Sequence, residues 1–196
     1  MTVQPELATP RLILRPFRLD DAAAVEQLAG AWSIADTTLN IPHPYPAGAG
    51  TTWIASHAER WEAGTNAVFA MQEKSSDKVV GALSLHIMRE ESVAELGYWV
   101  AVSRWGRGYC TEAAAEMLKF AFGDLGLKRV IARHMTRNGA SGRVMQKIGM
   151  QLETRIPNAV EKWGRPEDIA LYGANVEAWQ PIVNPPSRTS WNFERF

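Results

Sequence analysis

The stretch that most constrains this chain runs over residues 103–122, SRWGRGYCTEAAAEMLKFAF. A strand is predicted just before it, over residues 94–102. An amphipathic helix is predicted from Thr111, because its apolar positions recur at helical spacing and form a core-facing stripe: Ala114, Met117, Leu118, Ala121 and Phe122. Gly106 and Gly108 stand between strand and helix. Because glycine is costly to order and has no side chain to pack, this placement predicts that a ligand closely approaches the backbone.

A glycine-rich turn between a strand and a helix is suited to hold an anion. The first amides of the helix lack partners within it, and the helix dipole adds partial positive charge there. Arg107 adds a fixed charge, and Thr111 is placed to cap the helix or bind a phosphate oxygen. A nucleoside triphosphate, a dinucleotide and coenzyme A are the three ligands considered. A Walker A loop is excluded because its lysine is missing, and a dinucleotide fingerprint is excluded because Thr111 occupies its third glycine position.

The remaining elements predict an α+β protein: a mixed, mostly antiparallel sheet with helices on both faces. A strand over residues 11–17 precedes a helix capped by Asp20, whose apolar face extends to Trp32. Prolines and glycines predict a loop over 39–50. The other expected elements are a helix over 51–64, a hairpin of 66–73 and 79–88, a strand over 128–135, a short helix capped by Asn138 and ended by Gly149, and two last strands joined by the charged segment 161–168.

The bulk composition narrows the class of protein. The chain has 196 residues with 21 basic and 21 acidic side chains, so no basic excess favours nucleic acid. Cys110 is the single cysteine, which excludes an internal disulfide and a cysteine-built metal site and is typical of a reducing compartment. We find no signal peptide and no apolar run long enough to cross a bilayer. We therefore expect a cytoplasmic protein without metal, membrane or nucleic-acid partners.

The C-terminal part of the chain differs from the body. We expect one domain over residues 1–180 and a tail over 181–196 that is rich in proline yet carries Trp191, Phe193 and Phe196. Apolar aromatic side chains favour burial. The tail is therefore expected to pack on its own domain or on a second copy of the chain, which would make a homodimer.

Two motifs, RWGRGYCTEA at 104–113 and RNGASGRVMQKIGM at 137–150, resemble those of the GNAT superfamily of acetyl-coenzyme A-dependent N-acetyltransferases. The chain most resembles the branch that acetylates the N-terminal amines of ribosomal proteins. The likeness extends to TPRLILRPF, PHPYP, VVGALSL, ELGYWV and EDIALYG, and ends near Trp179.

The resemblance implies a binding mode for acetyl-coenzyme A. The strands at 94–102 and 128–135 would splay apart around the pantetheine arm, and loop amides would hold the pyrophosphate. The residues implied are Val100, Ala101, Val102, Trp105, Gly106, Arg107, Gly108, Tyr109, Cys110, Thr111, Asn138, Ser141 and Lys147. Cys110 departs from the family's small residue there, although cysteine is only slightly bulkier. A nucleophilic Cys110 is the minor alternative, because a helix N-terminus lowers a thiol pKa.

Acetyl transfer needs a neutral amine, a stabilised oxyanion and a leaving thiolate. Glu95 is the candidate base, as related enzymes use a glutamate from this region, often through water. An edge-strand glutamate in solvent is the alternative, and His86 and His134 are rivals as base. His134 alternates with apolar residues, which favours a packed, hydrogen-bonded histidine.

In many superfamily members a tyrosine in the helix of the second motif acts as the general acid. This chain has Met145 at that position. Ser141, one turn earlier, is the substitute that we select as general acid. Helix capping is the alternative role for it and for Asn138. The oxyanion would be held by a backbone amide near Val100 to Val102.

We therefore interpret the chain as an N-acetyltransferase that moves an acetyl group from acetyl-coenzyme A to an amine by direct attack in a ternary complex. A protein N-terminal α-amine is the leading acceptor, and a polyamine or amino-sugar the second. His43 and Tyr45 of the proline-rich loop are expected to contact this substrate. A non-catalytic module that binds acyl-coenzyme A remains the alternative from another class.

Overall fold

The computed structural model describes residues 3–180, and the expected tail and its aromatic residues lie outside them. Within this range one mixed sheet has eight strands in the order β1-β2-β3-β4-β5-β6-β8-β7. The strands are β1 (Leu7–Ala8), β2 (Leu12–Arg15), β3 (Asn66–Glu73), β4 (Lys78–Met88), β5 (Val93–Val100), β6 (Arg129–Met135), β7 (Gln151–Lys162) and β8 (Arg165–Asn175). All strand pairs are antiparallel except β5 with β6. The predicted α+β class is confirmed.

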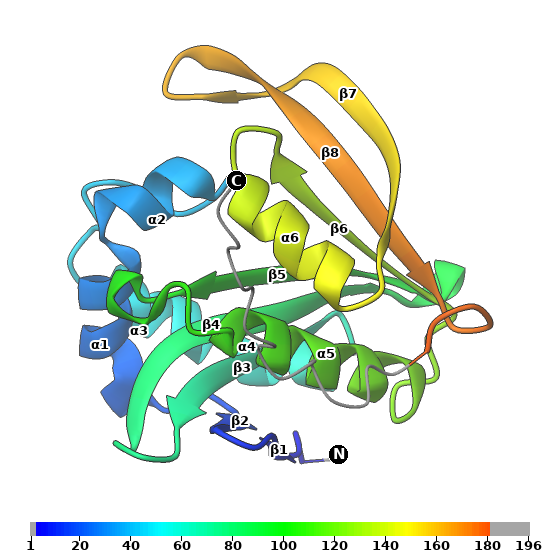
Figure 1. Ribbon diagram of the computed structural model, residues 1–196. Coiled ribbons are helices and arrows are strands. Elements are labelled where there is room, and N and C mark those ends of the chain that lie inside the picture. The colour runs from blue at the N-terminus through cyan, green and yellow to red at the C-terminus, as the bar shows by residue number, and fades with distance from the viewer. Residues whose placement is uncertain (1–2, 181–196) are drawn as a thin grey trace, which may run out of the picture.

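Helices cover both faces of the sheet (Figure 1). They are α1 (Ala22–Ala29), α2 (Trp32–Thr37), α3 (Ala49–Ala55), α4 (His57–Glu62), α5 (Tyr109–Phe122) and α6 (Gly139–Lys147). The predicted apolar stripe of α5 packs in the main core against Phe69 of β3, with Met117 and Leu118 fully buried. A second cluster joins Val25 of α1 to Ile54 of α3, and Trp99 of β5 packs against it.

Alternation along β5 therefore assigns its side chains to two sides. Leu96 and Tyr98 belong to the core beneath α5, whereas Trp99 packs toward α1 and α3. Because successive side chains of a strand point to opposite faces, Glu95 lies on the same side as Trp99. The candidate base and Tyr98 thus project from opposite faces of one strand.

The N-terminal helices differ from the prediction. Gly30 ends α1 by donating its amide to the carbonyl of Glu26, and extended Ala31 then starts a separate helix, α2. Trp32 consequently lies on the surface with half of its area exposed instead of continuing the apolar face of α1. The expected Asp20 cap is also wrong. The neighbouring Asp21 carboxylate accepts the Arg18 amide (2.8 Å) and pairs with Arg15.

Four other element boundaries differ from the prediction. The chain turns helical at Ala49, inside the expected loop, and the second helix is broken at Ser56 into α3 and α4. The helix α5 begins at Tyr109 instead of Thr111. The charged segment 161–168 is mostly strand: only Trp163 and Gly164 lie between β7 and β8, both with positive φ (54° and 72°). Positive φ at both central residues is typical of a tight hairpin turn.

Candidate active site

The site opens where β5 and β6 separate. Their parallel pairing covers three residue pairs, the last being Glu95 with Ile131, after which β6 follows β8 alone. A cavity of about 1140 Å³ fills the resulting gap and reaches from the 39–45 loop to the start of α5 and α6. The splay implied by the resemblance is therefore present, and Glu95 stands at its vertex.

The glycine loop forms one wall of this cavity. Gly106 and Gly108 have φ of 73° and 78°, a left-handed conformation that glycine adopts without the strain other residues incur. A Cβ added at Gly106 would meet no atom within 4 Å, so the backbone there faces open space. The first amides of α5, from Tyr109 to Thr111, have no acceptor within the helix. The loop therefore fits an anion such as the pyrophosphate of coenzyme A.

Arg11 of the N-terminal segment braces this loop from outside. Its Nη1 donates to the carbonyl of Arg107 (2.8 Å), its Nε pairs with Glu112 of α5 (2.6 Å), and its guanidinium lies 4.5 Å from the centre of the Tyr109 ring. Trp105 adds a bond from its indole nitrogen to the carbonyl of Val100 (2.7 Å). These contacts fix the loop before any ligand binds.

A second brace holds the Tyr109 side chain. Its hydroxyl donates to Glu73, which also accepts bonds from Arg104 (2.9 Å) and Ser76 (2.7 Å). Hydrogen bonds from Ser76, Tyr109 and Arg104 lower the pKa of Glu73 to about 2. The Tyr109 hydroxyl is therefore occupied by Glu73. The backbone amide of Tyr109 is the group of this residue that could bind the cofactor.

Most of the predicted cofactor residues line the cavity: Val100, Trp105, Gly106, Arg107, Gly108, Tyr109, Cys110, Thr111, Asn138, Ser141 and Lys147. Ala101 and Val102 do not. Ala101 is buried and donates its amide to the carbonyl of Val80 (2.8 Å), and Val102 is the exposed first residue of a 3-10 turn that runs to Arg104. The Ala101 amide is therefore already used and is not a free oxyanion donor.

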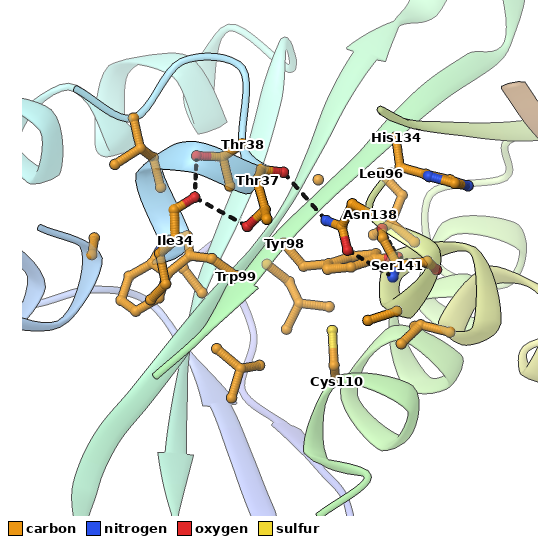
Figure 2. A pocket seen from close by; sticks show the side chains of 18 of the residues that line it. Ile34, Thr37, Thr38, Leu96, Tyr98, Trp99, Cys110, His134, Asn138 and Ser141 are labelled. Carbon is orange, nitrogen blue, oxygen red and sulfur yellow. Dashed lines mark hydrogen bonds between the residues drawn. The ribbon is translucent and has the colours of Figure 1, made fainter. Parts of the chain in front are cut away.

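Cys110 faces the cavity from the first turn of α5 (Figure 2). Burial raises the pKa of its thiol. A neutral thiol is a poor nucleophile, so this raised pKa argues against a nucleophilic role for Cys110.

Glu95 is held by an arginine that sequence reasoning missed. Arg133 of β6 binds its carboxylate through two bonds, of 2.7 and 2.9 Å, and both side chains line the cavity. The pairing with Glu95 raises the pKa of Arg133. Both carboxylate oxygens of Glu95 therefore accept hydrogen bonds from one guanidinium.

Of the two rival histidines, His134 lines the cavity and His86 does not. His86 is an exposed cross-strand neighbour of Glu95 outside the cavity lining. His134 is buried and bonds the carbonyl of Met135 through Nδ1 (2.8 Å). Its Nε2 has no partner among the described residues and packs against Gly142, where a Cβ would lie only 2.8 Å away. His134 is thus the packed residue that alternation predicted.

The N-terminus of α6 forms the other wall of the cavity. Asn138 caps it by accepting the Ser141 amide (3.2 Å), as predicted, and its Nδ2 donates to the carbonyl of Thr37 in α2 (3.3 Å). The Ser141 hydroxyl lies 2.8 Å from the hydroxyl of Tyr98, which crosses the gap from β5 (Figure 2). Tyr98 was missed, although alternation along β5 could have placed it on the cofactor side.

The proline-rich loop reaches the cavity in part. Tyr45 lines it together with Trp53 of α3, whereas His43 does not. His43 instead bonds the carbonyl of Gly30 (2.9 Å) and packs on Trp32, which stacks on Trp163 of the β7–β8 turn at 5.1 Å between ring centres. His43 therefore supports the loop, and Tyr45 remains as the candidate substrate contact.

Two cationic side chains link this loop and α2 to the β7–β8 hairpin. Arg137 binds Asp36 of α2 and Glu167 of β8, each at 2.7 Å. Lys162 donates to the carbonyls of Leu39 and Ile41, both at 3.3 Å. These bonds tie α2 and the loop to the β7–β8 hairpin, and they engage the carboxylates of Asp36 and Glu167.

Comparison with known proteins agrees with this geometry. Residues 11–151 match the model of the acetyltransferase (GNAT) domain. The uncharacterized N-acetyltransferase YnaD of Bacillus subtilis is 28% identical over 174 residues, which are 88% of this chain and 98% of that protein. Among the described residues no helix is long and apolar enough to cross a membrane, and no cluster of His, Cys, Asp or Glu could hold a metal ion.

Two solved structures share the fold. One is RimL, a ribosomal L7/L12 alpha-N-protein acetyltransferase in complex with coenzyme A, with a TM-score of 0.81 and 19% identity over 89% of this chain and 99% of that one. The other is a spermidine N-acetyltransferase SpeG chimera from Vibrio cholerae and hSSAT, with a TM-score of 0.73 and 15% identity over 85% and 96%. The chain belongs to the GNAT acetyltransferase family. It is an N-acetyltransferase that uses acetyl-coenzyme A and an amine acceptor.

Proposed function

We propose that the acceptor is the N-terminal α-amine of a protein or peptide, which attacks the acetyl group directly. The observation that carries this proposal is the ion pair at the vertex of the splay, where Arg133 holds Glu95 by two bonds. Both oxygens of this carboxylate already accept hydrogen bonds from the guanidinium, so its hydrogen-bonding capacity toward an incoming amine is reduced. An α-amine, with a pKa of about 7.7–8.0, needs little help to become neutral, whereas a primary alkylamine near 10.4 needs a strong base.

Paired charges near the acceptor loop support the same acceptor class. A polyamine carries several positive charges and needs free carboxylates in its binding site. Asp36 and Glu167 are both bound by Arg137, and Glu95 by Arg133, so each of these three carboxylates already has a cationic partner. The structural relatives include both classes, since one acetylates a protein α-amine and one acetylates spermidine.

The two faces of β5 give each residue a role. Bound acetyl-coenzyme A supplies a thioester that accepts the amine. The α5 amides and Gly106–Gly108 hold its pyrophosphate, and the amide of Val100 is the candidate donor to the acetyl oxygen. Glu95 receives the amine proton on the acceptor side, aided by Tyr45 as a substrate contact. Ser141 stands on the opposite side, at α6, as the candidate donor to the leaving sulfur.

An acceptor panel tests the proposal by measuring thiol release from acetyl-coenzyme A. The panel contains peptides with free N-termini, the same peptides blocked at the N-terminus, spermidine, an amino-sugar and free amino acids. We expect release with the free peptides and background rates with blocked peptides and spermidine. Faster release with spermidine or the amino-sugar than with every free peptide would show that the acceptor is a small amine.

A further inference from the structure

Tyr98 brings a tyrosine hydroxyl from the cavity lining to α6. It rises from the part of β5 that has no β6 partner, and its hydroxyl reaches the N-terminal turn of α6 across the gap. Met145, the α6 position where the family resemblance leads us to expect a tyrosine, is 1% exposed and packed in the core. A phenol is therefore present at this helix, but it comes from a different element.

Tyr98 has a single proton and two acceptors on the same residue. Its hydroxyl lies 3.1 Å from the carbonyl of Ser141 and 2.8 Å from the Ser141 hydroxyl. When Tyr98 donates to the hydroxyl oxygen, the shorter contact, the Ser141 proton is left free to donate into the cavity. When Tyr98 donates to the carbonyl, Ser141 must donate back to Tyr98. The state of Tyr98 thus decides whether Ser141 has a proton to offer.

The surroundings keep Tyr98 protonated and oriented. Burial raises the pKa of its phenol, and the other titratable groups that face it are Cys110 of α5 and Tyr172 of β8. Leu96 and Cys110 pack in the same core region as its ring. A permanent donor in a fixed place is suited to orient a neighbouring hydroxyl.

We propose that Tyr98 is a positioning residue that turns the Ser141 hydroxyl toward the sulfur of coenzyme A, and that the two together replace the missing tyrosine of α6. In the reaction a bond forms between the acceptor nitrogen and the acetyl carbon, and the carbon–sulfur bond breaks with its electron pair on sulfur. The Ser141 hydrogen bond stabilises that thiolate while Tyr98 and Ser141 keep their protons. Sulfur then takes a proton from solvent, matching the one that nitrogen loses. The inference rests on the proposed role of Ser141 but not on the identity of the acceptor.

The test is the pKa of the coenzyme A thiol bound to the protein, read from thiolate absorbance as pH is raised. A donor to the thiolate lowers this pKa below the ordinary thiol value of about 8.5. We expect Tyr98→Phe and Ser141→Ala each to raise it by about one unit, a tenfold change in thiolate stabilisation, and the double variant to raise it no further. Acetyl-transfer kcat should fall about tenfold in each single variant, with little change in KM for acetyl-coenzyme A.

Tyr172→Phe is the matched control, because Tyr172 is also a buried tyrosine beside α6, bonded by Gln146 (3.3 Å), but does not line the cavity. It should leave the thiol pKa unchanged, and Ser141→Thr, which keeps a hydroxyl, should restore most of the wild-type value. An unchanged thiol pKa in both Tyr98→Phe and Ser141→Ala would overturn the proposal. Additive shifts in the double variant would overturn the coupling. The titration of the coenzyme A thiol contains no acceptor amine. Its result is therefore independent of whether peptides with free N-termini are acetylated in the acceptor panel.

Discussion

Replacing Gly108 with valine is expected to lower the affinity for acetyl-coenzyme A by about 100-fold or more. Gly108 has a φ of 78°, and a β-branched residue in this conformation would shift the loop that presents the first amides of α5. Hydrogen bonds to a charged group each contribute about 1.5–3 kcal/mol, so losing two of them weakens binding about 100-fold or more. Isothermal titration with acetyl-coenzyme A measures the effect directly.

Gly126→Val is the control for backbone strain. Gly126 also has a positive φ (64°) and open space where a Cβ would lie, but it belongs to the turn between α5 and β6, outside the cavity. Both variants should lose roughly 1–2 kcal/mol of folding stability, and only Gly108→Val should lose cofactor affinity. Equal affinity losses in the two variants would mean that strain, and not the loop amides, explains the result.

Replacing Glu95 with glutamine is expected to lower kcat about 100-fold near pH 7, the lower end of the range for a general base. The loss should shrink as pH rises above 8, because an α-amine then loses its proton without help. Binding of acetyl-coenzyme A should be unchanged, because Glu95 stands on the acceptor face of β5. A kcat and pH profile for the best peptide acceptor provides the measurement.

Glu153→Gln is the matched control for this substitution. Glu153 also accepts two bonds from one arginine, both from Nη2 of Arg129 (2.7 and 2.6 Å), and its side chain is partly exposed like that of Glu95. Glu153 does not line the cavity. It should change stability about as much as Glu95→Gln while leaving turnover at the wild-type level. Normal turnover in Glu95→Gln would remove Glu95 from the mechanism and leave deprotonation of the amine to solvent.

Local sequence predicted the parts of the site that local physics determines. The glycine pair, the stripe of α5 and the Asn138 cap depend on neighbours within a few residues, and the structure has all three. The strand–helix order also determined the class of fold. The predicted helix boundaries were wrong where a single residue determines them. Gly30 ends α1, and the left-handed conformation of Gly108 lets α5 begin two residues before the predicted start.

The long-range contacts could not be predicted from spacing. Arg11 reaches Glu112, 101 positions away, and Arg133 reaches Glu95 across the vertex of the splay. The Tyr98–Ser141 bond needs two strands to part before the phenol can reach α6. Each of these pairs meets only after the sheet has formed. For this reason the conformation of the glycine loop could be predicted from the sequence more completely than the contacts of the candidate catalytic groups.

Locating the transferred acetyl group tests the central claim most directly. A peptide that carries both a free N-terminal α-amine and an internal lysine is incubated with the enzyme and acetyl-coenzyme A, and fragment mass spectrometry identifies the acetylated nitrogen. We predict acetylation of the α-amine alone, with none on the lysine. Acetylation of the lysine, or an unmodified peptide in a reaction that acetylates spermidine, would contradict the proposed function.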